Sequence, residues 1–210
     1  MRVFILLVVS GLLALCTGGA HAETGGNPLQ FVRTPTGYVV VWDESKSHFT
    51  VDLQGQHIRP SDIGGYAFFL DENVYQFLSV DPASFAAGEV SAHAILDRYM
   101  QYEVGHWHET IGMELPSVVH AREDSPERSF ILWEIQWTEQ ARQKAKAKAT
   151  KQLFLSAIAG DRVVVVSRTV VEGEDAAAAL SDFSAVARSL VIKDAPIDVK
   201  AIQDKIRGHQ

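Results

Sequence analysis

The stretch QLFLSAIAGDRVVVVSRTVV, residues 152–171, decides the fold of this chain. Two segments rich in β-branched and aromatic residues, 152–158 and 162–171, flank Gly160 and Asp161. A Gly-Asp pair between two such segments predicts a β-hairpin. Residues 163–166 are all valine and place apolar side chains on both faces of their strand, which is typical of a strand at the centre of a sheet. The stretch therefore predicts an antiparallel sheet with a buried middle.

Further strands and two helices are expected around this hairpin. Segments rich in apolar, aromatic and β-branched residues predict strands at 38–42, 48–53, 66–70, 74–80, 117–121 and 129–138. Apolar residues recur at helical spacing from Ser91, the expected N-cap, to Gly105, and again over residues 175–190. The order of four strands, a helix, four strands and a helix predicts an α+β fold. We expect a mainly antiparallel sheet covered by two helices in a layered sandwich.

Residues 1–22 have the layout of a secretory signal peptide. Arg2 supplies a positive start, residues 3–16 are almost entirely apolar, and Ala20-His21-Ala22 is typical of an A-x-A cleavage site. The apolar run is shorter than the ~20 residues that a membrane-spanning helix needs. The sequence therefore predicts a periplasmic or secreted protein, cleaved near Ala22.

The rest of the chain is expected to form one domain. Residues 23–36 contain several Gly and Pro residues and predict a flexible lead-in. Residues 37–193 are expected to be a single α+β domain, and residues 194–210 a weakly helical C-terminal tail. The only cysteine is Cys16, inside the predicted signal peptide, so the mature domain would have no disulfide and no thiol chemistry. The preceding Leu13-Ala14-Leu15 resembles a lipobox, which leaves lipidation of Cys16 as an alternative to plain cleavage.

Several features of this sequence resemble the PsbP/Mog superfamily, including the DcrB-type bacterial envelope proteins. Residues 152–190 give a strand, a Gly-Asp turn, a valine-rich strand, an acidic link and a helix that ends in ARSL. A second match is the strand around Phe49-Thr50-Val51, the loop after it and the hairpin of residues 66–80. The resemblance implies an antiparallel sheet between helices and an accessory or binding role. It carries over no site residues, because the family has no shared catalytic residues.

The sequence GHWHE, which begins at Gly105, is the candidate metal site. In an extended conformation His106 and His108 would point the same way, because side-chain direction repeats every two residues. Two imidazoles on one side can share a divalent transition metal such as Zn²⁺ or Cu²⁺. The candidates to complete such a site are Glu103, Glu109 and His120. The alternative is a helix exit with solvated histidines, and no other cofactor is expected.

A local basic run contains the candidate partner-binding residues Lys144, Lys146 and Lys148. Lysines so closely spaced favour contact with anionic groups such as lipid headgroups or an acidic partner, whereas the alternative is a solvated face. The whole chain has 19 Lys+Arg, 26 Asp+Glu and a formal net charge of −7. This acidic balance, together with export, disfavours nucleic acid as a partner. Contact with a membrane surface, without spanning it, stays possible.

No catalytic motif of the G-x-S-x-G, H-E-x-x-H or S-x-x-K type is present. We therefore predict a non-catalytic accessory protein that binds a protein partner or an envelope component. The first alternative is a metal-binding or metal-trafficking protein that uses His106 and His108. The second alternative is an envelope hydrolase, for which Ser47, His48 and Asp52 are a conceivable triad.

Overall fold

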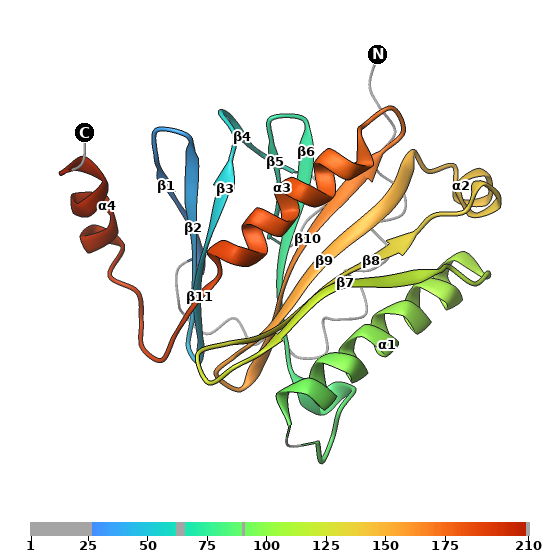
Figure 1. The fold of residues 1–210 in the computed structure, drawn as a ribbon, viewed down its shortest axis with the longest axis horizontal. Coiled ribbons are helices and arrows are strands. Elements are labelled where there is room, and N and C mark those ends of the chain that lie inside the picture. The colour runs from blue at the N-terminus through green and yellow to red at the C-terminus, as the bar shows by residue number, and fades with distance from the viewer. Residues whose placement is uncertain (1–26, 62–65, 90, 209–210) are drawn as a thin grey trace.

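The computed structural model describes residues 27–61, 66–89 and 91–208 (Figure 1). The predictions of a signal peptide at residues 1–22, of cleavage near Ala22 and of lipidation at Cys16 lie outside the described residues. The described residues form eleven strands in two sheets and four α-helices, and every strand pair is antiparallel. The fold class is therefore α+β, as predicted.

The larger sheet has seven strands, and the predicted hairpin lies at its centre. Its order is β4 (Ile58–Pro60), β5 (Tyr66–Leu70), β6 (Asn73–Val80), β10 (Arg162–Val171), β9 (Ala149–Ala159), β8 (Ser129–Gln136) and β7 (Ser117–Asp124). Arg162 pairs with Ala159 across the turn of Gly160 and Asp161. The valine-rich strand β10 is the middle strand of the seven, which confirms the sequence prediction.

The smaller sheet has four strands, and the sequence did not predict it as a separate sheet. Its order is β1 (Leu29–Arg33), β2 (Gly37–Glu44), β3 (Ser47–Gln54) and β11 (Val191–Lys193). Part of the predicted flexible lead-in, residues 23–36, thus forms a strand, because β1 pairs with β2 along its whole length. The short strand β11 pairs with β3 directly after the last long helix.

Four helices accompany the sheets: α1 (Ala92–Ile111), α2 (Glu139–Ala145), α3 (Ala176–Ser189) and α4 (Val199–Arg207). A short 3₁₀ helix, Pro82–Ser84, precedes α1. Figure 1 shows α3 lying across the sheets, α1 beside β7 and β8, and α4 at the opposite end beyond β1. The helical part of the predicted C-terminal tail corresponds to α4. Within the described residues, no helix is long and apolar enough to cross a membrane.

Helix α1 is longer than predicted. Ser91 is its N-cap, as expected, and its Oγ accepts a hydrogen bond from the backbone N–H of Ala94 at 3.2 Å. The helix does not end at Gly105 but continues to Ile111, and its C-cap, Gly112, has a left-handed φ of 68°. A glycine inside a helix costs about 1 kcal/mol, and burial of Trp107 beyond it outweighs that cost.

The core has two parts, one on each face of the larger sheet. On one face, Val164 and Val166 of β10 pack in a cluster that includes the smaller sheet and α3. On the other face, Val163 and Val165 belong to a cluster that includes α1. Within this second cluster Trp133 stacks on Phe154, with ring centroids 4.2 Å apart. The smaller sheet and α3 thus share one face, which differs from the predicted single sheet between two helices.

Candidate functional site

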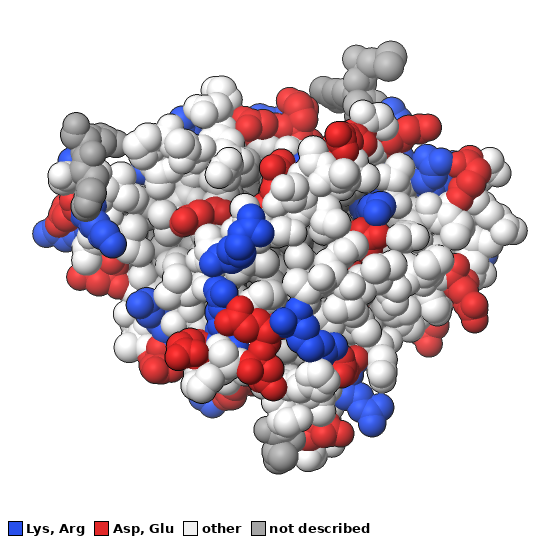
Figure 2. Space-filling model, viewed as in Figure 1, with Lys and Arg blue, Asp and Glu red and all other residues white. Residues whose placement is uncertain are grey.

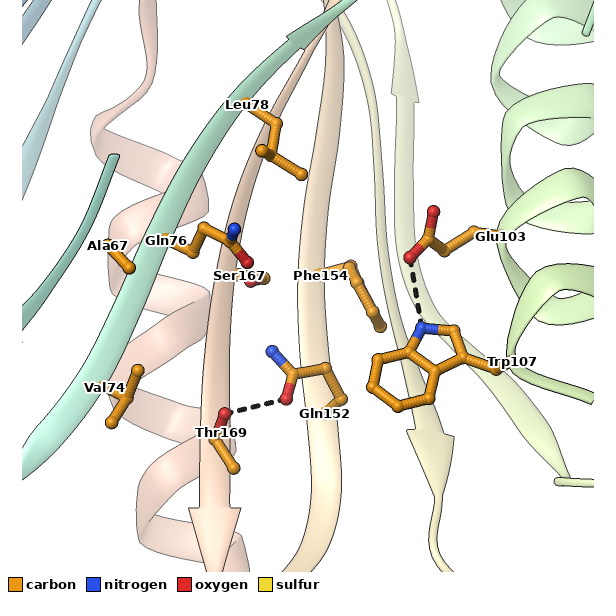
Figure 3. A pocket seen from close by; sticks show the side chains of 10 residues that line it. All are labelled: Ala67, Val74, Gln76, Leu78, Glu103, Trp107, Gln152, Phe154, Ser167 and Thr169. Atoms are coloured by element: carbon orange, nitrogen blue, oxygen red, sulfur yellow. Dashed lines mark hydrogen bonds between the residues drawn. The ribbon is translucent and has the colours of Figure 1, made fainter. Parts of the chain in front are cut away.

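A small pocket, lined by both apolar and polar side chains, lies on the face of the larger sheet that carries α1 (Figure 3). Strands β5, β6, β10 and β9 form its floor, and α1 forms one wall. Its volume is about 20 Å³, which is room for about one water-sized group. The residues that line it are Ala67, Val74, Gln76, Leu78, Glu103, Trp107, Gln152, Phe154, Ser167 and Thr169. Among these described residues none is histidine, cysteine or lysine.

The polar floor arises from a change of character along β9 and β10. The side chains on this face of β10 are apolar at Val163 and Val165 but polar at Ser167 and Thr169. Strand β9 changes in the same way, from Phe154 to Gln152. Buried polar groups need hydrogen-bond partners, and Thr169 Oγ1 donates to Gln152 Oε1 at 2.8 Å.

The side wall contains a buried acid on α1. Glu103 is 5% exposed. Its carboxylate accepts hydrogen bonds from Trp107 Nε1 at 3.0 Å and from the Tyr99 hydroxyl at 3.4 Å. All three residues share one side of the helix, since they are four positions apart. Figure 3 shows Glu103 and Trp107 facing the pocket from the helix, opposite Gln76 and Leu78.

Burial shifts the pKa of the Glu103 carboxyl away from its ordinary value. Burial raises the pKa of Glu103 from 4.5 to about 7, although the hydrogen bonds from Trp107 and Tyr99 act in the opposite direction. The carboxyl therefore changes charge near neutral pH. An acid whose pKa is raised by burial and which lines a pocket is a candidate functional group. The pocket can offer a carboxyl, two carboxamides and two hydroxyls to a ligand.

The structure contradicts the extended conformation assumed for His106 and His108. Both lie in α1, where side chains two positions apart point in nearly opposite directions, about 160° apart around the helix axis. The ring of His108 faces the end of the helix, with Nε2 3.1 Å from the carbonyl oxygen of Leu115. The two imidazoles therefore do not present themselves on one side, and that part of the metal prediction is wrong.

The other predicted metal ligands are also apart. Glu109 is exposed on α1. His120 lies on β7, where its Nε2 is 3.0 Å from Oε2 of Glu134. In the part of the chain that the structure describes, no group of three or more His, Cys, Asp or Glu side chains is placed to hold a metal ion.

Glu134 is a second buried acid, and the ammonium of Lys151 is its counter-ion. It is 1% exposed on the α3 face of β8. Lys151 Nζ donates to both carboxylate oxygens at 2.8 and 3.1 Å, and Gln136 Nε2 donates at 2.7 Å. Burial raises the pKa of Glu134, but the hydrogen bonds from Lys151, Gln136 and His120 outweigh burial, so the pKa lies below its ordinary value. This acid stays charged and joins β7, β8 and β9.

The predicted basic run surrounds the end of α2. Lys144 Nζ donates to the carbonyl oxygen of Gly112 at 3.1 Å, at the C-terminal end of α1, where a positive charge is favourable. Lys146 caps α2 with a left-handed φ of 52°. Lys148 lies in the link to β9, and all three side chains are exposed. Two of the three thus have a local structural role, and contact with a partner stays a prediction.

The conceivable hydrolase triad does not form. The hydroxyl of Ser47 accepts a hydrogen bond from Trp42 Nε1 at 3.2 Å in the core. His48 pairs with Asp43, with Nδ1 2.5 Å from Oδ1, rather than with Asp52. These three predicted residues are therefore not assembled as nucleophile, base and orienting acid.

The sequence suggested Glu103 only as a metal ligand, and its place in a pocket was not predicted. One signal was present: Tyr99, Glu103 and Trp107 follow a spacing of four, so an acid lies within the buried stripe of a helix.

No protein-family model matches the chain, and no curated protein matches it significantly.

Proposed function

We propose that this chain is an exported, non-catalytic accessory protein that binds a protein partner or an envelope component, of which one compact group enters the pocket beside Glu103. Export, with cleavage near Ala22, places it in the periplasm or outside the cell. The observation that carries the proposal is the convergence of polar side chains from three strands and a helix on one partly open pocket. Ligand sites combine mostly apolar walls with a few placed polar groups, and this lining has that composition.

The polar floor supports binding over a purely structural role. Ser167 and Thr169 occupy positions in β10 where valine, as at Val163 and Val165, would give a drier core. Burying polar groups weakens a fold unless their hydrogen bonds are made. Departures from simple core patterning of this kind are typical of functional sites.

The arrangement of the helices also supports the proposal. Helices α1 and α3 pack on opposite faces of the larger sheet, and the smaller sheet shares the face of α3. The proposed resemblance to the PsbP/Mog superfamily and its DcrB-type members also implies helices on both sides of a sheet. The accessory roles that the resemblance implies suit a pocket without a histidine, cysteine or lysine.

Surface charge limits the kind of partner. On the face shown in Figure 2, basic and acidic side chains lie beside one another rather than in a single basic field. This supports leaving nucleic acid out of the proposed partners. The proposal includes contact with an anionic membrane surface, without spanning it, through the exposed side chains of Lys144, Lys146 and Lys148.

Affinity capture with matched variants tests the proposal. The exported form is tagged, purified and incubated with an envelope extract. Gln76→Leu changes a half-buried pocket residue, and Gln30→Leu makes the same change at an exposed site on β1. We expect the same partner on the wild-type and Gln30→Leu proteins and its loss on Gln76→Leu.

Two outcomes contradict the proposal. The first is capture that Gln76→Leu leaves unchanged, which removes the pocket as the binding site. The second outcome concerns export. Cell fractionation is expected to find the chain outside the cytosol, without residues 1–22. A full-length chain confined to the cytosol contradicts that part.

A further inference from the structure

Among the residues that the structure describes, two glutamates are buried, and they have very different partners. Glu134 receives hydrogen bonds from the ammonium of Lys151 and lies beside the imidazole of His120. Glu103 is bonded to an indole N–H and a phenol hydroxyl, which are both uncharged. Since a buried charge is costly unless an opposite charge compensates it, the first glutamate is satisfied within the chain and the second is not.

No described residue supplies a cation to Glu103. Burial and the two uncharged hydrogen-bond donors account for its ionisation behaviour, with no contribution from Lys, Arg or His within residues 27–61, 66–89 and 91–208. The buried guanidinium of Arg168, by contrast, is paired with the carboxylate of Glu174. When Glu103 is ionised, its negative charge faces the pocket without a counter-ion.

The pocket has the size and walls for a small cation. Its volume of about 20 Å³ suits one compact group, such as an ammonium, and is too small for a planar guanidinium. Trp107 and Phe154 line it with aromatic rings, and a cation close to an aromatic face is attracted to it. The side-chain carboxamide of Gln76 adds an acceptor for the N–H donors of an ammonium.

From this geometry we infer that the pocket binds the primary ammonium group at the end of an alkyl chain, with the carboxylate of Glu103 as its counter-ion. The inference rests on the proposed binding function of the same pocket and names the chemistry of its ligand. Two sources share this chemistry, a free alkylamine and the side chain of a lysine residue in a peptide.

Titration calorimetry on the exported form at pH 8 tests the inference. The probes are n-butylamine, n-butanol as an uncharged analogue of the same length, and n-butylguanidine as a larger cation. We expect saturable binding of n-butylamine only. If wild-type protein binds n-butanol in addition to the amine, or does not bind the amine, the inference is wrong. Neither result depends on the folding of a variant.

Two variants on α1 assign the counter-ion. Glu103→Gln is expected to weaken n-butylamine binding by about tenfold to a hundredfold, the range for hydrogen bonds to charged groups. Glu109→Gln makes the same change at an exposed position of the same helix and is expected to bind as wild type. Equal affinity of both variants overturns the role of Glu103.

A last comparison distinguishes a lysine side chain from a free alkylamine as the source of the ammonium. It also separates the ammonium assignment from the proposed binding function. Tighter binding of an N-acetylated, C-amidated lysine than of n-butylamine assigns the site to a peptide, and the reverse assigns it to a free amine. If no amine binds while capture from envelope extract still requires Gln76, the ammonium assignment is wrong and the proposed function stands.

Discussion

Replacing Glu103 by glutamine should make the folded protein more stable at pH 8. Burial raises the pKa of this carboxyl from 4.5 to about 7. At about 1.4 kcal/mol per pH unit, ionising it costs about 3 kcal/mol more in the folded chain than in the unfolded chain. Glutamine has the same shape, and its carbonyl oxygen can accept the hydrogen bond that Trp107 donates. Glu103→Gln therefore removes the cost of ionisation and keeps the packing.

The sign of the pH dependence follows from proton binding. Between pH 4.5 and about 7 the folded state keeps the proton of Glu103 and the unfolded state releases it. The wild-type free energy of unfolding therefore loses up to about 3 kcal/mol as the pH rises through this interval, because the folded state binds more protons there. Below pH 4.5 both states are protonated at this group, so the difference between wild type and variant no longer changes with pH.

Urea unfolding at several pH values between 4 and 8.5 measures this effect. The difference between wild type and Glu103→Gln isolates one group, because all other titrating groups are common to both proteins. Glu109→Gln, at an exposed position on the same helix, should follow the wild-type profile. If the profiles of wild type and Glu103→Gln run parallel across the whole range, the carboxyl is not buried as described.

Three further predictions, one of them with a control substitution, test the fold. At Gly160, with a φ of +61°, an added Cβ would lie 1.8 Å from the carbonyl oxygen of Lys46. Gly160→Ala should therefore lose more unfolding free energy in urea than Gly173→Ala. Gly173 also has a positive φ, +89°, but open space around it, so strain alone costs about 1–3 kcal/mol there; equal losses would argue against the close approach. Asp175→Ala removes the N-cap of α3 and should cost about 1 kcal/mol in thermal unfolding, and no change would contradict the cap. Phe183→Ala opens the core between α3 and the sheets and should cost about 3–5 kcal/mol by calorimetry, whereas a loss below about 1 kcal/mol would mean that α3 is not packed there.

Local signals explain why the sequence predicted most of the larger sheet. A hairpin is specified by its turn residues and by the strands on each side, so β5 with β6 and β9 with β10 followed from neighbouring residues. Strand β11 did not follow, because its three residues form a strand only where α3 returns the chain to β3. The division into two sheets has the same origin: it depends on which distant strands pair, and no residue near a turn encodes that choice.

The pocket escaped prediction because its parts lie in elements that are far apart in the sequence. The hairpin that decides the fold also contains Gln152 and Thr169, but their position beside α1 depends on how that helix packs across the sheet. Had Gly105 ended the helix, Trp107 would not lie one turn beyond Glu103 and could not hold its carboxylate. Continuation of α1 past this glycine thus creates both the covered side of the pocket and the buried acid. Because the chain stays helical past Gly105, the side chains of His106 and His108 point in different directions. The continued helix therefore both removes the predicted metal site and builds the pocket.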